Sequence, residues 1–143
     1  MLTTYRAGFQ LVVGRGSKSN ENPLISNGKS ALALENHLKQ VPEDARARIL
    51  LAVDDASNDR AEDALRETNL AVALRPNEAM ILYNAACNYC VLKRKTEAMD
   101  AIKKAWDAGY RDADWARRDP DLALLLGDPE FEKLFPASAG AKA

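Results

Sequence analysis

Two short segments, QVPEDA at residues 40–45 and LRPNEA at residues 74–79, place prolines 34 residues apart. When the sequence is shifted by that distance, several small residues between and beyond the prolines also coincide. The coincident pairs are Ala52 with Ala86, Ala64 with Ala98, and Ala71 with Ala105. A regular period of this length indicates a chain that is built from repeated structural units.

Each period contains two segments whose apolar residues have helical spacing. In the segment DARARILLAVDDAS, residues 44–57, the spacing is carried by Ala45, Ile49, Leu50, Ala52 and Val53. The segments 61–74, 79–92 and 96–109 show similar spacing. Pro76 ends the second of these segments, because proline lacks an amide N–H and restricts the residue before it. The sequence therefore predicts an all-α fold made of helix pairs.

These residues resemble the tetratricopeptide repeat. The resemblance rests first on the 34-residue spacing and on the closing prolines Pro42 and Pro76. It also rests on the small residues of each first helix, on the tyrosine that follows one of them, and on the alanines that open each second helix: Ala52, Ala86, Tyr89, Ala64 and Ala98. It covers about residues 30–110 and implies an α-solenoid. The sequence departs from the repeat pattern at Asp55, Thr68 and Tyr110.

The predicted organisation is a single domain over residues 1–143 that ends in a helical cap. An irregular first repeat over 1–43, with an inserted loop over 14–28, precedes repeats over 44–77 and 78–111, capping helices over 112–136 and a tail over 137–143. In the first repeat, TTYRAGFQLVV at 3–13 is expected to form an amphipathic helix, and SALALENHLKQV at 30–41 is expected to form its partner.

The C-terminal segment contains two Asp-Pro pairs, Asp119-Pro120 and Asp128-Pro129. Each pair predicts a helix start, because aspartate caps a helix and proline is tolerated in its first turn. Leu122, Leu125, Phe131 and Leu134 are expected to cover the apolar edge of the last repeat. This ending resembles tetratricopeptide segments at the C-termini of some bacterial serine/threonine kinases, adenylate cyclases and transcriptional regulators. The resemblance implies an interaction or regulatory segment without catalytic activity.

In tetratricopeptide proteins the first helix of each pair lines a concave face that binds peptides. The residues that the resemblance places on this face are Arg46, Ile49, Leu50, Val53, Met80, Tyr83, Asn84, Cys87 and Cys90. Because the set is mostly apolar, we expect a protein partner that offers a hydrophobic or helical peptide. Two alternatives remain open: the groove is filled by the chain's own N-terminal helix or by a second copy in a homodimer, or the chain is a structural spacer.

Composition argues against several other classes of partner. The chain has 20 basic and 21 acidic residues and a formal net charge of −1, so no nucleic-acid footprint is expected. No apolar run is long enough to span a membrane, and the N-terminus is a poor secretory signal. Two cysteines do not make a disulfide framework, which favours a reducing, cytoplasmic location.

A phosphate-binding loop is the alternative from another functional class. NGKSALAL at 27–34 resembles the end of such a loop, and ILLAVDD at 49–55 resembles the strand that would hold magnesium. Against it, Pro23 stands where the motif requires a glycine, and the 34-residue period predicts a helix over 49–55. We therefore expect no enzyme activity and no cofactor, and keep a nucleotide-binding protein using Lys29 and Ser30 as the alternative.

The remaining reactive side chains are expected to have structural roles. CNYC at 87–90 holds both cysteines mid-helix, where the helix N-terminus cannot lower a thiol pKa, so packed or groove-lining thiols are expected. A metal or disulfide that bridges a dimer stays the alternative, with no metal site within one chain. We expect His37 to have a surface or packing role, and Asp54-Asp55 to be solvated or to cap a helix.

Overall fold

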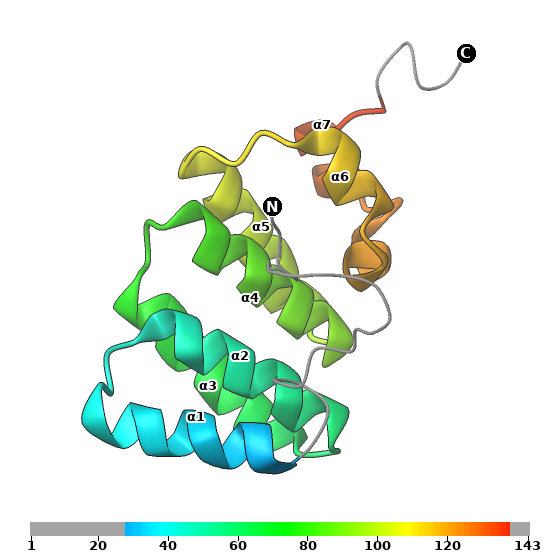
Figure 1. Cartoon of the computed structure of the whole chain (residues 1–143). Helices are drawn as coiled ribbons and strands as arrows, with labels where there is room; N and C mark the ends of the chain where they lie inside the picture. The colour runs from blue at the N-terminus through cyan, green and yellow to red at the C-terminus, as the bar shows by residue number, and fades with distance from the viewer. Residues whose placement is uncertain (1–27, 138–143) are drawn as a thin grey trace.

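The computed structural model describes residues 28–137, and within that range all regular secondary structure is helical (Figure 1). The elements are α1 Gly28–Gln40, α2 Ala45–Ser57, α3 Ala61–Leu74, α4 Ala79–Val91, α5 Lys95–Asp107, α6 Ala113–Arg118, the 3-10 helix η2 Pro120–Leu125, and α7 Pro129–Leu134. This confirms the all-α prediction. The helix expected at 3–13, the tail beyond 137, and the loop expected at 14–28 apart from Gly28 lie outside the described residues.

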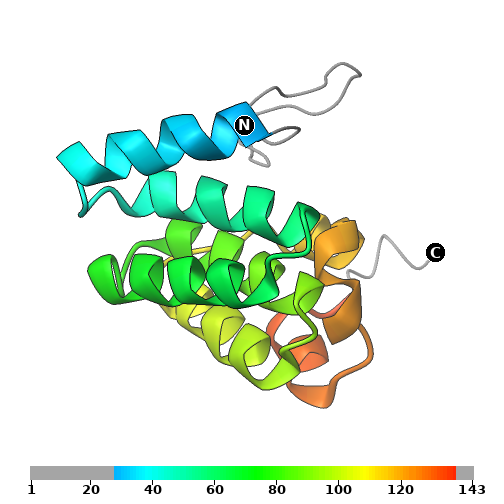
Figure 2. The same ribbon diagram turned by 90° about the horizontal axis from the view of Figure 1, so that it is seen from below.

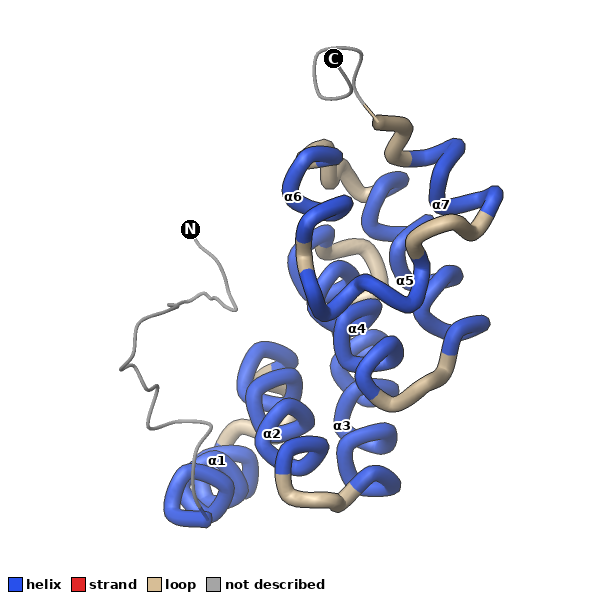
Figure 3. The backbone as a smooth tube through the Cα atoms, turned by 90° about the vertical axis from the view of Figure 1, so that its right-hand side faces the viewer, coloured by secondary structure: helices blue, strands red, loops and turns tan. Residues whose placement is uncertain are grey.

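The helices pack in chain order. α2 packs against α3 and α4 packs against α5, while α1 adds to the α2 side and α3 contacts α4. Figures 2 and 3 show the result as a stack, with α1 at one end and the segment α6–α7 at the other. The first residues of α2 and α4, Ala45 and Ala79, are 34 positions apart, as are those of α3 and α5. The helix pairs therefore recur with the period that the sequence predicts.

The turn inside each helix pair repeats as well. Asp59 and Lys93, also 34 positions apart, both adopt left-handed backbone conformations with φ of 63° and 64°. In each turn the next amide bonds back into the helix end: Arg60 N–H donates to the Asp55 carbonyl and Arg94 N–H to the Tyr89 carbonyl, both at 2.8 Å. Such bonds satisfy carbonyl groups that a helix C-terminus leaves without partners. The backbone geometry therefore repeats even where the side chains differ.

The core is built from small residues between helices and from large residues near the C-terminus. Ala52, Ala64, Ala86 and Ala98 are completely buried, which lets paired helices approach closely. The cap contributes the largest buried side chains, Phe131 and Phe135, together with Leu122 and Leu125. Burial of each such side chain contributes on the order of 1.5–3 kcal/mol.

Both Asp-Pro pairs begin helical turns as predicted. The Asp119 side chain accepts a hydrogen bond from Asp121 N–H, and the Asp128 side chain accepts from Glu130 and Phe131 N–H. Gly127, with φ of 87°, makes the turn between η2 and α7. η2 packs against α4 and α7 against α5, so the C-terminal segment closes the end of the stack.

The expectation for Asp54 and Asp55 was wrong. Both side chains are buried, with exposed fractions of 0% and 2%, rather than solvated, and neither caps a helix N-terminus. Arg60, in the turn after α2, forms ion pairs with both of them. Both carboxylates lie on buried positions of α2. Two consecutive aspartates in a sequence are normally taken as exposed, so the pattern does not indicate this burial.

The segment 49–55 belongs to helix α2, so it is not the strand that a magnesium-binding nucleotide site would use. This agrees with the preference for the repeat over the phosphate-binding loop. No helix among residues 28–137 is both long and apolar enough to cross a lipid bilayer.

Candidate functional site

Five of the predicted binding residues lie at least partly on the surface, on α2 and α4. Arg46 and Met80 are exposed, Met80 by 43%, while Leu50, Val53 and Asn84 are half-buried. α2 and α4 contact each other although they belong to successive helix pairs. We call the surface formed by Arg46, Leu50, Val53, Met80 and Asn84 the α2–α4 face.

The other four predicted binding residues are buried. Ile49, Tyr83, Cys87 and Cys90 have exposed fractions between 2% and 4%. For the three residues on α4, the physical reason is that the C-terminal segment folds back, so that η2 packs against α4. Ile49, on α2, is buried in the core cluster that it shares with residues of α4. A partner on the surface of this structure cannot contact these four side chains. They belong to the hydrophobic core and do not form the α2–α4 face.

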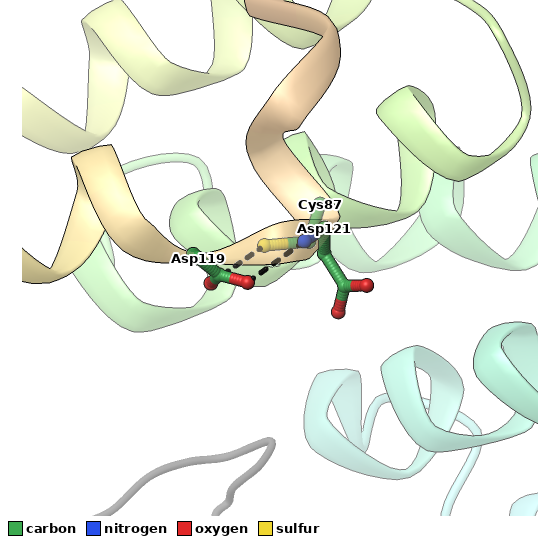
Figure 4. A group of neighbouring side chains, drawn as sticks. All are labelled: Cys87, Asp119 and Asp121. Carbon is green, nitrogen blue, oxygen red and sulfur yellow. Dashed lines mark hydrogen bonds between the residues drawn. The ribbon is translucent and has the colours of Figure 1, made fainter. Parts of the chain in front are cut away.

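A small polar network joins α4 to the start of η2 (Figure 4). Tyr83 Oη donates a hydrogen bond of 2.6 Å to Asp119 Oδ2, and Cys87 Sγ lies 3.7 Å from the same oxygen. The other oxygen, Oδ1, accepts from Asp121 N–H at 2.9 Å. Tyr83 also stacks on Tyr110, with ring centroids 4.5 Å apart. Asp119 was predicted as a helix cap, but its contact with Tyr83 was not foreseen.

The network favours a neutral tyrosine and a carboxylate that accepts every bond. Burial and the nearby Cys87 and Asp119 raise the pKa of Tyr83 far above its ordinary value, so the hydroxyl keeps its proton. A hydrogen bond to an ionised group is about twice as strong as a neutral one. The contact therefore fastens the cap to α4.

The same residues include a group with metal-ligating atoms. Cys87, Asp119 and Asp121 each offer one such atom, and these atoms lie within 4.8 Å of one another (Figure 4). Both oxygens of Asp119 already accept hydrogen bonds that the helix start and Tyr83 require. We therefore interpret the group as a helix cap with a buried thiol.

The two thiols have the surroundings of structural cysteines. Cys87 and Cys90 are not joined in a disulfide, and both lie in the second half of α4, away from its N-terminus. Burial, aided by Asp121 and Asp119, raises the pKa of the Cys90 thiol to about 12. Since the thiolate is the reactive form, Cys90 is a poor nucleophile and a poor metal ligand at neutral pH.

His37 lies on the surface of α1 and contacts Asp44, with 2.8 Å between Nε2 and Oδ2. Asp44 also caps α2 by accepting from Ala47 N–H. The contact joins the end of α1 to the start of α2. A surface or packing role, as expected from the sequence, accounts for this geometry.

Comparison with known proteins finds a distant relative. The chain is similar to a chloroplastic protein of Arabidopsis thaliana, with 30% identity over 115 residues that cover 77% of this chain and 34% of that protein. The chain thus spans about a third of the length of the relative that it matches. No family model matches the chain, and no solved structure matches it significantly.

Proposed function

We propose that the chain is a short α-solenoid of the tetratricopeptide type and that it acts as a protein-interaction module, as an adaptor or a regulatory scaffold without catalysis. The 34-residue recurrence of helix starts supports the proposed repeat. The left-handed backbone conformations of Asp59 and Lys93 support it independently, because they were not part of the apolar sequence pattern from which the repeat was inferred.

The observation that carries the proposal is the composition of the α2–α4 face. The adjacent helices α2 and α4 present the exposed Met80 and the half-buried Leu50 and Val53, while Arg46 and Asn84 supply polar groups. Leu50 also packs against the apolar cluster between α1 and α2. An apolar centre with a few polar groups fits an amphipathic helix or a peptide, whose side chains fill the apolar part. A reducing compartment such as the cytoplasm would suit two cysteines that are not joined in a disulfide.

The test compares two charge substitutions at equally exposed apolar residues. Met80 on the α2–α4 face is 43% exposed and Leu70 on α3 is 40% exposed, so Met80→Asp and Leu70→Asp change similar surfaces. Wild type and both variants would be used for affinity capture from the source cell, with quantitative mass spectrometry of the bound proteins.

We expect Met80→Asp to lower recovery of the main bound protein at least about tenfold, as loss of a central interface residue does. Leu70→Asp should leave recovery unchanged. Equal recovery by both variants, with both folded by circular dichroism, would remove the α2–α4 face from the proposal.

A further inference from the structure

Asp54 is a completely buried acid whose oxygens lack hydrogen bonds. It lies near the C-terminal end of α2, and its exposed fraction is 0%. Neither carboxylate oxygen has a hydrogen-bond partner. The nearest compensating charge is Arg60 Nη2, at 3.6 Å from Oδ2. A buried carboxylate normally has several donors, because losing its hydration is costly.

Asp54 lies on the side of α2 that packs against α1. Ala47 and Leu51 precede it by seven and three positions, which places all three on one side of the helix. Ala47 and Leu51 form an apolar cluster with Leu34 and Leu38 of α1. The carboxylate of Asp54 therefore stands at the edge of an otherwise apolar helix interface.

The charges around Asp54 do not balance. Asp55, 2% exposed, has its Oδ1 at 3.0 Å from Arg60 Nε, so a single guanidinium serves two carboxylates. Further negative charge comes from Glu35 on α1, which acts on Asp54, and from Asp63 on α3, which acts on Asp55. Burial, with these neighbours, raises the pKa of both Asp54 and Asp55 above that of an exposed aspartate.

The next repeat shows what this position holds when it is satisfied. Asn88, 34 residues after Asp54, is neutral, and its Nδ2 donates to Thr68 Oγ1 at 3.3 Å. The residue 34 positions before Thr68 is Leu34, which has no polar side-chain atom. The first repeat thus has the acid Asp54 where the second has the amide Asn88. It also has Leu34 where the second has Thr68, so it lacks a hydroxyl that could bond to this position.

We propose that Asp54 is a proton-binding site at the α1–α2 interface, and that its protonation strengthens the packing of α1 against α2. Protonation removes one negative charge from the group formed by Asp54, Asp55 and Arg60. A neutral carboxyl leaves Arg60 to pair with Asp55 alone. Protonation of Asp54 therefore makes the α1 end of the stack more stable in mildly acidic solution. Acid usually has the opposite effect and lowers the stability of a folded protein.

The sign follows from proton linkage. In the relevant pH range the folded protein binds more protons at Asp54 than the unfolded chain does, because the folded carboxyl binds its proton more tightly. Stability therefore rises as pH falls towards the unfolded aspartate value of about 3.9 and is constant with respect to this group below it. For one proton the folding constant changes by at most about tenfold per pH unit.

The experiment combines a direct titration with a stability profile. Carbon-13 NMR of the aspartate carboxyl groups gives the midpoint of the Asp54 titration in the whole chain. The Asp54 signal is assigned by its absence from the spectrum of Asp54→Asn. Urea unfolding between pH 8 and pH 4.5 gives the folding constant for wild type, for Asp54→Asn, and for a control at the exposed Asp107, Asp107→Asn. Amide exchange in α1, expressed as protection factors, reports the interface itself.

We expect the titration midpoint of Asp54 to lie above about 3.9, the value of an aspartate in an unfolded chain. We also expect the ratio of the Asp54→Asn and wild-type folding constants to shrink as pH falls, by several-fold over the range. The control ratio should stay constant, and α1 protection should rise on acidification only when Asp54 is present. A titration midpoint for Asp54 at or below about 3.9, or a constant ratio for Asp54→Asn, would overturn the proposal.

Discussion

The contact between Tyr83 and Asp119 gives the sharpest prediction about stability. Tyr83→Phe removes only the hydroxyl group, which donates to Asp119 Oδ2 at 2.6 Å, and keeps the ring that stacks on Tyr110. Both partners are buried, so water cannot replace the lost donor. A hydrogen bond to a charged group contributes about 1.5–3 kcal/mol. Because Asp121 N–H and Cys87 still contact Asp119, we expect the free energy of unfolding to fall by about 2 kcal/mol.

The assay is urea unfolding at pH 7, followed by the fluorescence of Trp106 and Trp115. Tyr89→Phe is the matched control, since Tyr89 donates to the neutral Asn69 at a partly buried site. Loss of the Tyr89–Asn69 hydrogen bond should lower the free energy of unfolding by less, about 0.5–1.5 kcal/mol, as for an ordinary hydrogen bond. A cost for Tyr83→Phe below about 0.5 kcal/mol, or no larger than that of the control, would refute the role given to Asp119 in fastening the cap.

Two further predictions concern backbone strain and thiol chemistry. Lys93 has φ of 64°, a conformation that favours glycine, so Lys93→Gly should raise the free energy of unfolding by up to about 1 kcal/mol in the same urea assay. Lys93→Ala should show no such gain, and a gain of equal size would point to removal of charge instead. The pKa of Cys90 is raised to about 12, so in a Cys87→Ser background the thiol should react with Ellman's reagent far more slowly in the folded protein than in urea at pH 7.5, and equal rates would contradict its burial.

The sequence predicts the helices well because the evidence for them is local and repeated. Two prolines and three alanine pairs at one spacing indicate where the helix pairs lie. Each Asp-Pro pair marks the start of a helix at its proline. The expected helix at 30–41 corresponds to α1, which begins two residues earlier and ends one residue earlier. The repeating turns at Asp59 and Lys93 could not be predicted from residue type, because neither position is a glycine.

The candidate site is predicted less completely, because its accessibility depends on contacts between distant segments. Tyr83 and Cys87 occupy the positions that the repeat pattern assigns to a groove, yet η2, more than 30 residues later, packs over them. The pattern of one repeat contains no information about this return of the chain. Asp119 was the available signal: a capping acid has a second oxygen that needs a donor, and Tyr83 provides it.

The central claim is that a protein partner binds the α2–α4 face, and site-specific photo-crosslinking tests it most directly. A photoreactive phenylalanine analogue would be placed at Met80, and in a second sample at Leu70 on α3, two residues of similar exposure. The account predicts a crosslink to a defined partner from position 80 that Val53→Asp abolishes, and none from position 70. Crosslinking of the same partner from position 70 alone, or from neither position while the partner still co-purifies, would contradict it.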